Sequence, residues 1–188
     1  MYQRFTSLND EDFEFLRAHT RYNAATIELW YESFKKDCPN RFLTREKYIE
    51  IYKKFFPDGD AEKFSEHVFR TFDTDHNGVL DFREFLLAIN IMSGGSREEK
   101  LKWAFKVFDV AGNNVIHQDE MTKIIDSIYA LSGMSSTNVE KPAEDRAKCM
   151  FYLMDENQDG KLTEKEFIQY CLKNEDLVRM LDQNMAQN

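Results

Sequence analysis

Apolar side chains recur along most of the chain with the spacing of amphipathic helices. Between residues 26 and 34 they stand at i, i+3, i+4 and i+7, and similar stripes follow further along the chain. Pro57 ends one stripe, and Ser93-Gly94-Gly95-Ser96 separates two others. The pattern predicts helices over 26–34, 48–56, 64–72, 85–89, 101–108, 121–128, 147–154, 162–171 and 177–181, with an irregular insert at 132–142.

The short polar segments between these helices repeat one another. Two of them, 73–84 and 155–166, carry Asp or Asn at positions one, three and five, Gly at position six and Glu at position twelve. A weaker copy spans 109–120, and a degraded copy spans 36–47. A repeat with helix–loop–helix content predicts paired units on either side of Gly94-Gly95.

The two complete loops have the composition of a calcium site. Calcium prefers six to eight oxygen ligands in a flexible shell, and the turn at position six needs the backbone freedom of Gly. The seventh residue offers its backbone carbonyl, and the final Glu can bind with both oxygens. The predicted ligands are Asp73, Asp75, Asn77, Val79, Asp81 and Glu84 in one loop, and Asp155, Asn157, Asp159, Lys161, Thr163 and Glu166 in the other.

Loop 109–120 is poorer in ligands. Ala111 stands at position three and has no side-chain oxygen, and Asn114 replaces Gly at position six. The candidate ligands that remain are Asp109, Asn113, Val115 and Glu120. We expect this loop to bind calcium weakly or not at all.

Loop 36–47 has no carboxylate at a ligand position. Cys38 and Pro39 lie inside it, Arg41 occupies position six, and Lys47 places a cation where the chelating carboxylate belongs. We expect this loop to bind no calcium. The chain should therefore hold two Ca²⁺ ions, for which Mg²⁺ can compete.

Composition narrows the class of protein. The 188 residues carry 34 acidic and 25 basic side chains, so the net charge of −9 argues against binding nucleic acid through general phosphate neutralisation. A hydrophobic content of 42% is enough for a packed core. Three cysteines without a CxxC spacing favour a reduced cytoplasmic protein over a zinc or disulfide scaffold, and no apolar run is long enough to span a membrane.

These features predict an all-α protein of the EF-hand class, with two lobes that each contain a pair of helix–loop–helix units. The apolar eighth residues, Leu80 and Leu162, can form a short two-stranded β-pairing with the neighbouring loop. The expected divisions are an N-terminal lobe at 1–93, a Gly-rich hinge at 94–96, a C-terminal lobe at 97–174 and a C-terminal helix or tail at 175–188.

Several segments resemble the neuronal calcium sensor family, especially its recoverin, visinin and neurocalcin branch. The Cys-Pro pair inside a degraded first loop is the most specific of them. The segments are Trp30-Tyr31 with Phe34, Lys36-Asp37-Cys38-Pro39, 53–57, 67–73, 81–85, 101–105 and 162–168. The resemblance implies a calcium sensor whose N-terminal lobe opens an apolar groove and binds an amphipathic helix of a receptor kinase, a guanylate cyclase or an ion channel.

The resemblance also suggests which side chains form the groove. Their spacing fits helix faces that open when calcium rotates an exit helix, although the same residues could instead fill a closed core. The groove candidates are Trp30, Phe34, Ile51, Tyr52, Phe55, Phe56, Phe82, Phe85, Leu86 and Ile89.

The chain departs from the family in two places. It begins Met1-Tyr2 and so lacks the acceptor Gly for N-myristoylation, which excludes a calcium–myristoyl switch on this chain as given and leaves membrane association open. Ala111 weakens a loop that is usually a good calcium site in the family. The segment 176–185 could cover the groove as a plug.

Other functions compete with a calcium sensor. A calcium buffer needs the loops but no groove, and a constitutive EF-hand subunit binds its partner at every calcium level. The sequence shows no nucleophile–base set, and its histidines at 19, 67, 76 and 117 lack metal-ligand spacing, so we expect no enzyme. A homodimer remains an open alternative.

Overall fold

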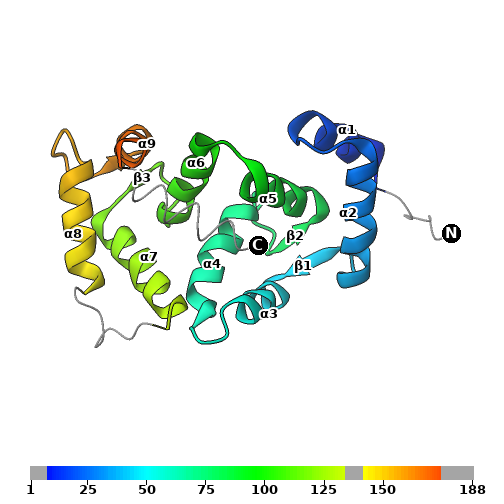
Figure 1. The fold of residues 1–188 in the computed structure, drawn as a ribbon, viewed down its shortest axis with the longest axis horizontal. Coiled ribbons are helices and arrows are strands. Elements are labelled where there is room, and N and C mark those ends of the chain that lie inside the picture. Colours follow the sequence, from blue (N-terminus) through cyan, green and yellow to red (C-terminus); the bar gives the residue numbers. More distant parts are fainter. Residues whose placement is uncertain (1–7, 134–141, 175–188) are drawn as a thin grey trace.

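The computed structural model describes residues 8–133 and 142–174, which form helices joined by short loops (Figure 1). The all-α class is confirmed, and a helix forms at each predicted stripe except 177–181, which lies outside the described residues. The helix predicted over 162–171 begins at Glu164, because residues 162 and 163 form a short strand. The elements are α1 Asp10–His19, α2 Ala24–Asp37, β1 Phe42–Thr44, α3 Arg45–Phe55, α4 Ala61–Phe72, β2 Val79–Asp81, α5 Phe82–Gly94, α6 Arg97–Phe108, β3 Val115–Ile116, α7 Gln118–Leu131, α8 Ala143–Met154, β4 Leu162–Thr163 and α9 Glu164–Lys173.

The ninth residue of each loop begins the helix that leaves it. Thr44, Asp81 and Thr163 are N-caps whose side-chain oxygens accept the amide of the third helical residue, and His117 occupies the same place in loop 109–120. This bond satisfies an amide that the helix itself cannot pair. Because the cap is also the ninth loop position, each loop is joined rigidly to its exit helix.

The loops pair in twos through the predicted short strands. β1 and β2 are antiparallel with Leu43 opposite Leu80, and β3 and β4 are antiparallel with Ile116 opposite Leu162. These four side chains are at most 2% exposed. The two-stranded pairings predicted from the eighth loop positions are therefore confirmed, and the degraded loop 36–47 keeps its structural place beside loop 73–84.

Each lobe has its own hydrophobic core. The core of the N-terminal lobe centres on Leu16, Ile27, Val68 and Leu86, and the core of the C-terminal lobe centres on buried side chains of α6 to α9. Trp103 of α6 packs against both cores. Its ring stacks on Phe72 of α4 with centroids 5.4 Å apart. The lobes are therefore in direct contact.

Helix α1 was not predicted from the apolar pattern. Asn9 caps it, accepting the Asp12 amide, and its first turn is acidic, which favours a helix N-terminus. Leu16 is fully buried against the N-terminal core, and Arg83 of α5 lies over the ring of Phe15 at 3.4 Å. The acidic first turn after Asn9 was the signal that could have identified this helix.

The predicted hinge is short in the structure. Helix α5 continues through Gly94, Ser96 caps α6, and α6 begins at Arg97. A side chain on Gly94 would collide with the guanidinium of Arg21, which donates to the backbone carbonyl of Asn90. The segment between the lobes is thus packed against the α1–α2 connection.

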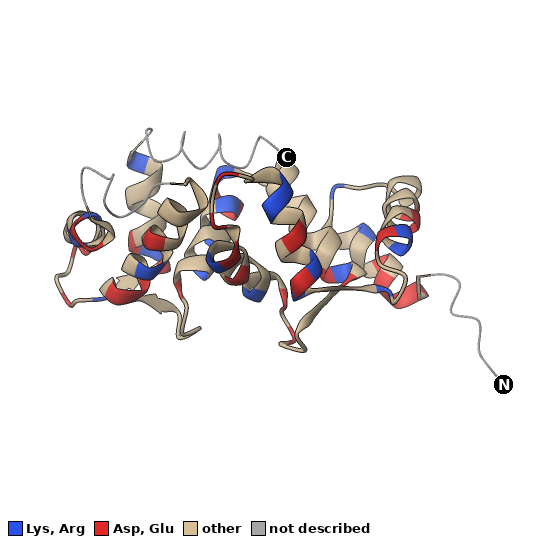
Figure 2. Ribbon diagram, turned by 90° about the horizontal axis from the view of Figure 1, so that it is seen from below, with Lys and Arg blue, Asp and Glu red and all other residues tan. Residues whose placement is uncertain are grey.

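Charges of both signs are spread over the helices rather than gathered on one face (Figure 2). Among the described residues, no helix is long and apolar enough to cross a membrane. The predicted tail at 175–188, including the candidate plug at 176–185, and most of the insert lie outside the described residues.

Candidate functional site

Loop 73–84 runs from the end of α4 to the start of α5 and folds around its own side-chain oxygens. The two carboxylate oxygens of Asp73 accept the amides of Asn77 and Gly78, each at 3.0 Å. Asp75 accepts the Asn77 amide at 3.1 Å, and Asn77 accepts the Val79 amide at 2.9 Å. These bonds turn the predicted ligands toward the inside of the loop.

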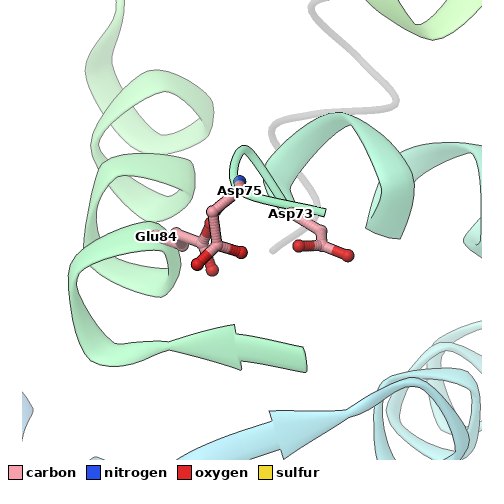
Figure 3. Close-up of side chains that lie close together, drawn as sticks. All are labelled: Asp73, Asp75 and Glu84. Atoms are coloured by element: carbon pink, nitrogen blue, oxygen red, sulfur yellow. The ribbon is translucent and has the colours of Figure 1, made fainter. Parts of the chain in front are cut away.

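The final glutamate closes this loop. One oxygen of Glu84 accepts the amide and the hydroxyl of Thr74, at 2.8 and 2.9 Å, and the other accepts the Asp81 amide at 3.2 Å. Asp73, Asp75 and Glu84 offer oxygens that all lie within 4.8 Å of one another (Figure 3). Among the described residues, no other set of three His, Cys, Asp or Glu side chains comes this close together. Asp73 and Glu84 are also buried, so a divalent cation would relieve a close carboxylate repulsion.

Loop 155–166 has the same backbone but a more open set of ligands. Asp155 accepts the amides of Asp159 and Gly160 at 3.2 and 3.0 Å, and Asn157 accepts the Asp159 amide at 2.9 Å. Asp159 in turn accepts the amide of the predicted backbone ligand, Lys161, at 2.9 Å.

The final glutamate of this loop bonds to the residue that caps its own helix. Glu166 accepts the amide and the hydroxyl of Thr163, at 2.9 and 2.7 Å, within the first turn of α9. The structure therefore does not gather Asp155, Asp159 and Glu166 as closely as the three carboxylates of loop 73–84.

Loop 109–120 adopts the same fold despite its poorer ligands. Asp109 accepts the amides of Asn113 and Asn114 at 3.1 and 2.8 Å, and Asn113 accepts the Val115 amide at 3.2 Å. Glu120 accepts the Ala111 amide at 2.7 Å and the His117 amide at 2.8 Å. Asn114 takes the left-handed backbone, with φ of 63°, that Gly78 and Gly160 take in the other loops. Ala111 leaves the third ligand position without an oxygen.

The degraded loop 36–47 retains the turn but has no carboxylate at a ligand position. Arg41 has φ of 68° at the sixth position, and its amide donates to the Cys38 carbonyl at 2.8 Å. Cys38 is 6% exposed, and burial raises the pKa of its thiol, which is the behaviour of a packed cysteine.

The N-terminal lobe contains an apolar cavity of about 430 Å³ between α2, α3 and α5. Of the groove candidates, Trp30, Ile51, Tyr52, Phe55, Phe56, Phe85 and Ile89 line it. Phe55 is 57% exposed, although an apolar side chain of this size is usually buried. Burial raises the pKa of the Tyr52 hydroxyl and, more strongly, that of Tyr48, so the wall stays uncharged at neutral pH.

Three groove candidates lie elsewhere. Phe34, Phe82 and Leu86 are at most 4% exposed and belong to the core behind the cavity, so they fill a closed core here, the alternative left open by their spacing. Phe34 contacts Phe85 with ring centroids 5.0 Å apart and so supports the wall from behind. The sequence reasoning did not place Tyr22, Leu43, Tyr48, Met92 and Ser93, which complete the lining.

Comparison with known proteins agrees with this architecture. Two family profiles, each described as an EF-hand domain pair, match residues 43–91 and 98–172. Recoverin of Homo sapiens is 36% identical over 179 residues, which cover 93% of this chain and 90% of recoverin. The chain belongs to the neuronal calcium sensor family.

Other members of the family are similarly close. Neuronal calcium sensor 1 of Lymnaea stagnalis is 39% identical over 183 residues, which cover 96% of each protein. Visinin of Gallus gallus is 33% identical over 182 residues, which cover 95% of each protein. This neuronal calcium sensor is therefore a calcium-binding EF-hand protein, as the sequence predicted.

Proposed function

We propose that this protein binds calcium at loops 73–84 and 155–166 and, when loaded, holds an amphipathic helix of a target protein in the groove of its N-terminal lobe. The observation that carries the proposal is the convergence of Asp73, Asp75 and Glu84 at the N-terminus of α5, whose side chains Phe85 and Ile89 line the apolar cavity. An ion at this loop acts on the helix that forms one wall of the groove.

Geometry supports unequal calcium sites. Loop 73–84 holds three carboxylates within 4.8 Å of one another, whereas loop 155–166 forms no such set and its Glu166 accepts the Thr163 amide. At its ligand positions, loop 109–120 has only the carboxylates of Asp109 and Glu120, and Ala111 offers no side-chain oxygen. We therefore assign strong binding to the first loop, weaker binding to the second, and weak or no binding to loop 109–120.

Titration calorimetry of the full chain tests these sites. Two calcium ions should bind, and Glu84→Gln and Glu166→Gln should each remove one of them. Glu120→Gln is the matched control, because it makes the same chemical change in a loop that we assign little or no calcium. Three sites of equal affinity, or loss of a strong site with the control variant, would contradict the assignment.

The groove is suited to apolar side chains of a helix. Its lining is almost entirely aromatic and aliphatic, and cavities with such linings bind ligands chiefly through apolar contact. The exposed ring of Phe55 lies at its edge. An amphipathic helix presents apolar residues at i, i+3, i+4 and i+7 and can insert them as a row.

Binding of a fluorescent amphipathic model peptide, in calcium and in chelator, tests the groove. Phe55→Ala should weaken calcium-dependent binding about tenfold or more, as expected when a large aromatic side chain is removed from an interface. Tyr152→Ala is the matched control, because Tyr152 is 80% exposed on α8 of the other lobe. Equal binding in calcium and chelator would indicate a constitutive subunit, and no binding in either would indicate a buffer.

A further inference from the structure

Arg70 of α4 reaches from the N-terminal lobe into the C-terminal lobe. Its guanidinium donates to the carbonyl of Asp109 at 3.1 Å and to that of Val110, and it also donates to the carbonyls of Val107 at 3.0 Å and Lys106 at 3.3 Å. These carbonyls belong to the last residues of α6 and the first residues of loop 109–120. Carbonyls at a helix C-terminus lack partners within the helix and carry partial negative charge, so a forked cation with five donors suits them.

The same guanidinium brings positive charge to the ends of the poorest predicted calcium loop. The carboxylates of Asp109 and Glu120 attract it and oppose the burial that lowers the pKa of Arg70. Asp109 and Glu120 are 7% and 4% exposed, so solvent screens this attraction only partly. Arg70 thus supplies loop 109–120 with a permanent countercharge from the other lobe.

Loop 109–120 is joined in turn to loop 155–166. Val115 pairs with Thr163 and Ile116 pairs with Leu162, so the two loops share one strand pair. Thr163 is a predicted calcium ligand and caps α9, the helix that carries Glu166. A shift of loop 109–120 therefore moves the residues that must close around the ion in loop 155–166.

At its other end, Arg70 is tied to loop 73–84. It lies in the last turn of α4, and Asp73, the first ligand of the loop, caps that helix by donating its amide to the Phe69 carbonyl at 2.9 Å. Phe72, between them, stacks on Trp103 of α6. The end of α4 therefore cannot reorient without disturbing the contacts that Arg70 and Phe72 make with α6.

We propose that Arg70 is a positioning residue that couples the two calcium loops, so that an ion in loop 73–84 raises the affinity of loop 155–166. The coupling passes through loop 109–120, which serves as a structural link. This inference rests on the proposed function, because it requires both outer loops to bind calcium. Coupling of this kind is reciprocal, so filling loop 155–166 also strengthens binding at loop 73–84.

A double-mutant cycle on the full chain measures the coupling. Calcium is titrated while the amide resonances of Gly78 and Gly160 report each loop separately. The proteins are the unchanged chain, Glu84→Gln, Arg70→Met and the double variant. Arg17→Met is the control for charge, because Arg17 is half exposed on α1 and pairs with neighbouring Glu14 of the same helix.

With Arg70 present, Glu84→Gln should weaken calcium binding at loop 155–166 about fivefold or more, the lower end of usual coupling factors. With Arg70→Met, the same change should have an effect of less than about twofold, and Arg17→Met should behave like the unchanged chain. A residue that only stabilised the fold would shift affinities without removing the dependence on Glu84. If Arg70→Met does not fold, Arg70→Lys replaces it and should reduce the coupling, because an ammonium cannot satisfy all four carbonyls.

An equal effect of Glu84→Gln with and without Arg70 would overturn the inference, and so would no effect in either background. The proposed function fails by a different observation. If the Gly160 resonance of the unchanged chain does not respond to calcium at all, loop 155–166 binds none.

Discussion

Glu84 and Glu120 make corresponding contacts in their loops, so their Gln variants distinguish an effect on calcium binding from an effect on folding stability. They are 6% and 4% exposed, and each closes its loop by accepting an amide near the loop's start and the amide of the N-cap residue. Only the loop of Glu84 is proposed as a strong calcium site. We therefore expect Glu120→Gln to be the less stable variant in chelator and Glu84→Gln to be the less stable variant in calcium.

The expected changes in unfolding free energy in chelator follow from the contacts of the two glutamates. Gln keeps one carbonyl oxygen, so each variant loses a carboxylate acceptor for one amide, and bonds to a charged group contribute about 1.5–3 kcal/mol. In loop 73–84 the change also removes repulsion from Asp73, whose oxygen lies within 4.8 Å. At an effective dielectric constant of about 20 this repulsion is about 3 kcal/mol, which offsets the lost bond. Glu120→Gln also gives up the attraction between Glu120 and Arg70.

In calcium the order of stability of the two variants should reverse. An ion present at about 1,000 times its dissociation constant stabilises the folded state by about 4 kcal/mol, and Glu84→Gln should lose this increment. Denaturant unfolding of the full chain in chelator and in calcium measures both values. We expect Glu120→Gln to be the less stable variant in chelator and Glu84→Gln to gain less stability from calcium. If both variants gained the full increment, or if Glu120→Gln lost it, the assignment of loop 73–84 as the stronger site would be refuted.

Further predictions concern packing and titration. Gly59→Ala should destabilise the protein by about 1–3 kcal/mol, measured by denaturant unfolding, because its new Cβ would lie 1.8 Å from a backbone oxygen at the end of α7. A thiol reagent should modify exposed Cys149 quickly and Cys171 slowly, since Cys171 is 3% exposed and burial raises its pKa to about 11; equal rates would contradict the packing. Burial, and then the charge of Arg70, lowers the pKa of His67, so the neutral ring is favoured in the folded state. The stability that His67 contributes is therefore present above its ordinary pKa of 6.5 and is lost as pH falls through and below that value, and His67→Gln should reduce the loss of unfolding free energy between about pH 7.5 and pH 5.5.

The proposed calcium loops could be predicted from the spacing of residues along the chain, because every ligand of a loop lies within twelve residues. Alternating oxygens, Gly78 and Glu84 specify a turn that closes on itself, and the structure folds it that way through bonds among those same residues. The strand pairs were predicted from the apolar eighth residues Leu80 and Leu162, because the loop repeat gives each lobe two such residues that can pair. The predicted helices reflect a period of 3.6 residues that any core-facing helix must show.

Local spacing did not decide which apolar residues face the groove. Phe82, Leu86 and Phe85 share one helix, yet the first two are buried in the core and the third lines the cavity. A stripe shows that a side chain is removed from water, but the neighbouring helices determine whether it meets the core or an open wall. Helix α1, whose Leu16 completes the core, likewise gains its stability from contacts with distant α5.

The link between the lobes was decided by tertiary structure alone. In the sequence, Arg70 looks like an ordinary surface residue of a helix. The carbonyls to which it donates lie about 40 residues further along the chain. No short-range pattern encodes such a contact, since it exists only when α4 and α6 are packed together. Metal chelation is local chemistry that a stretch of twelve residues can specify, whereas communication between metal sites depends on how the helices are placed in space.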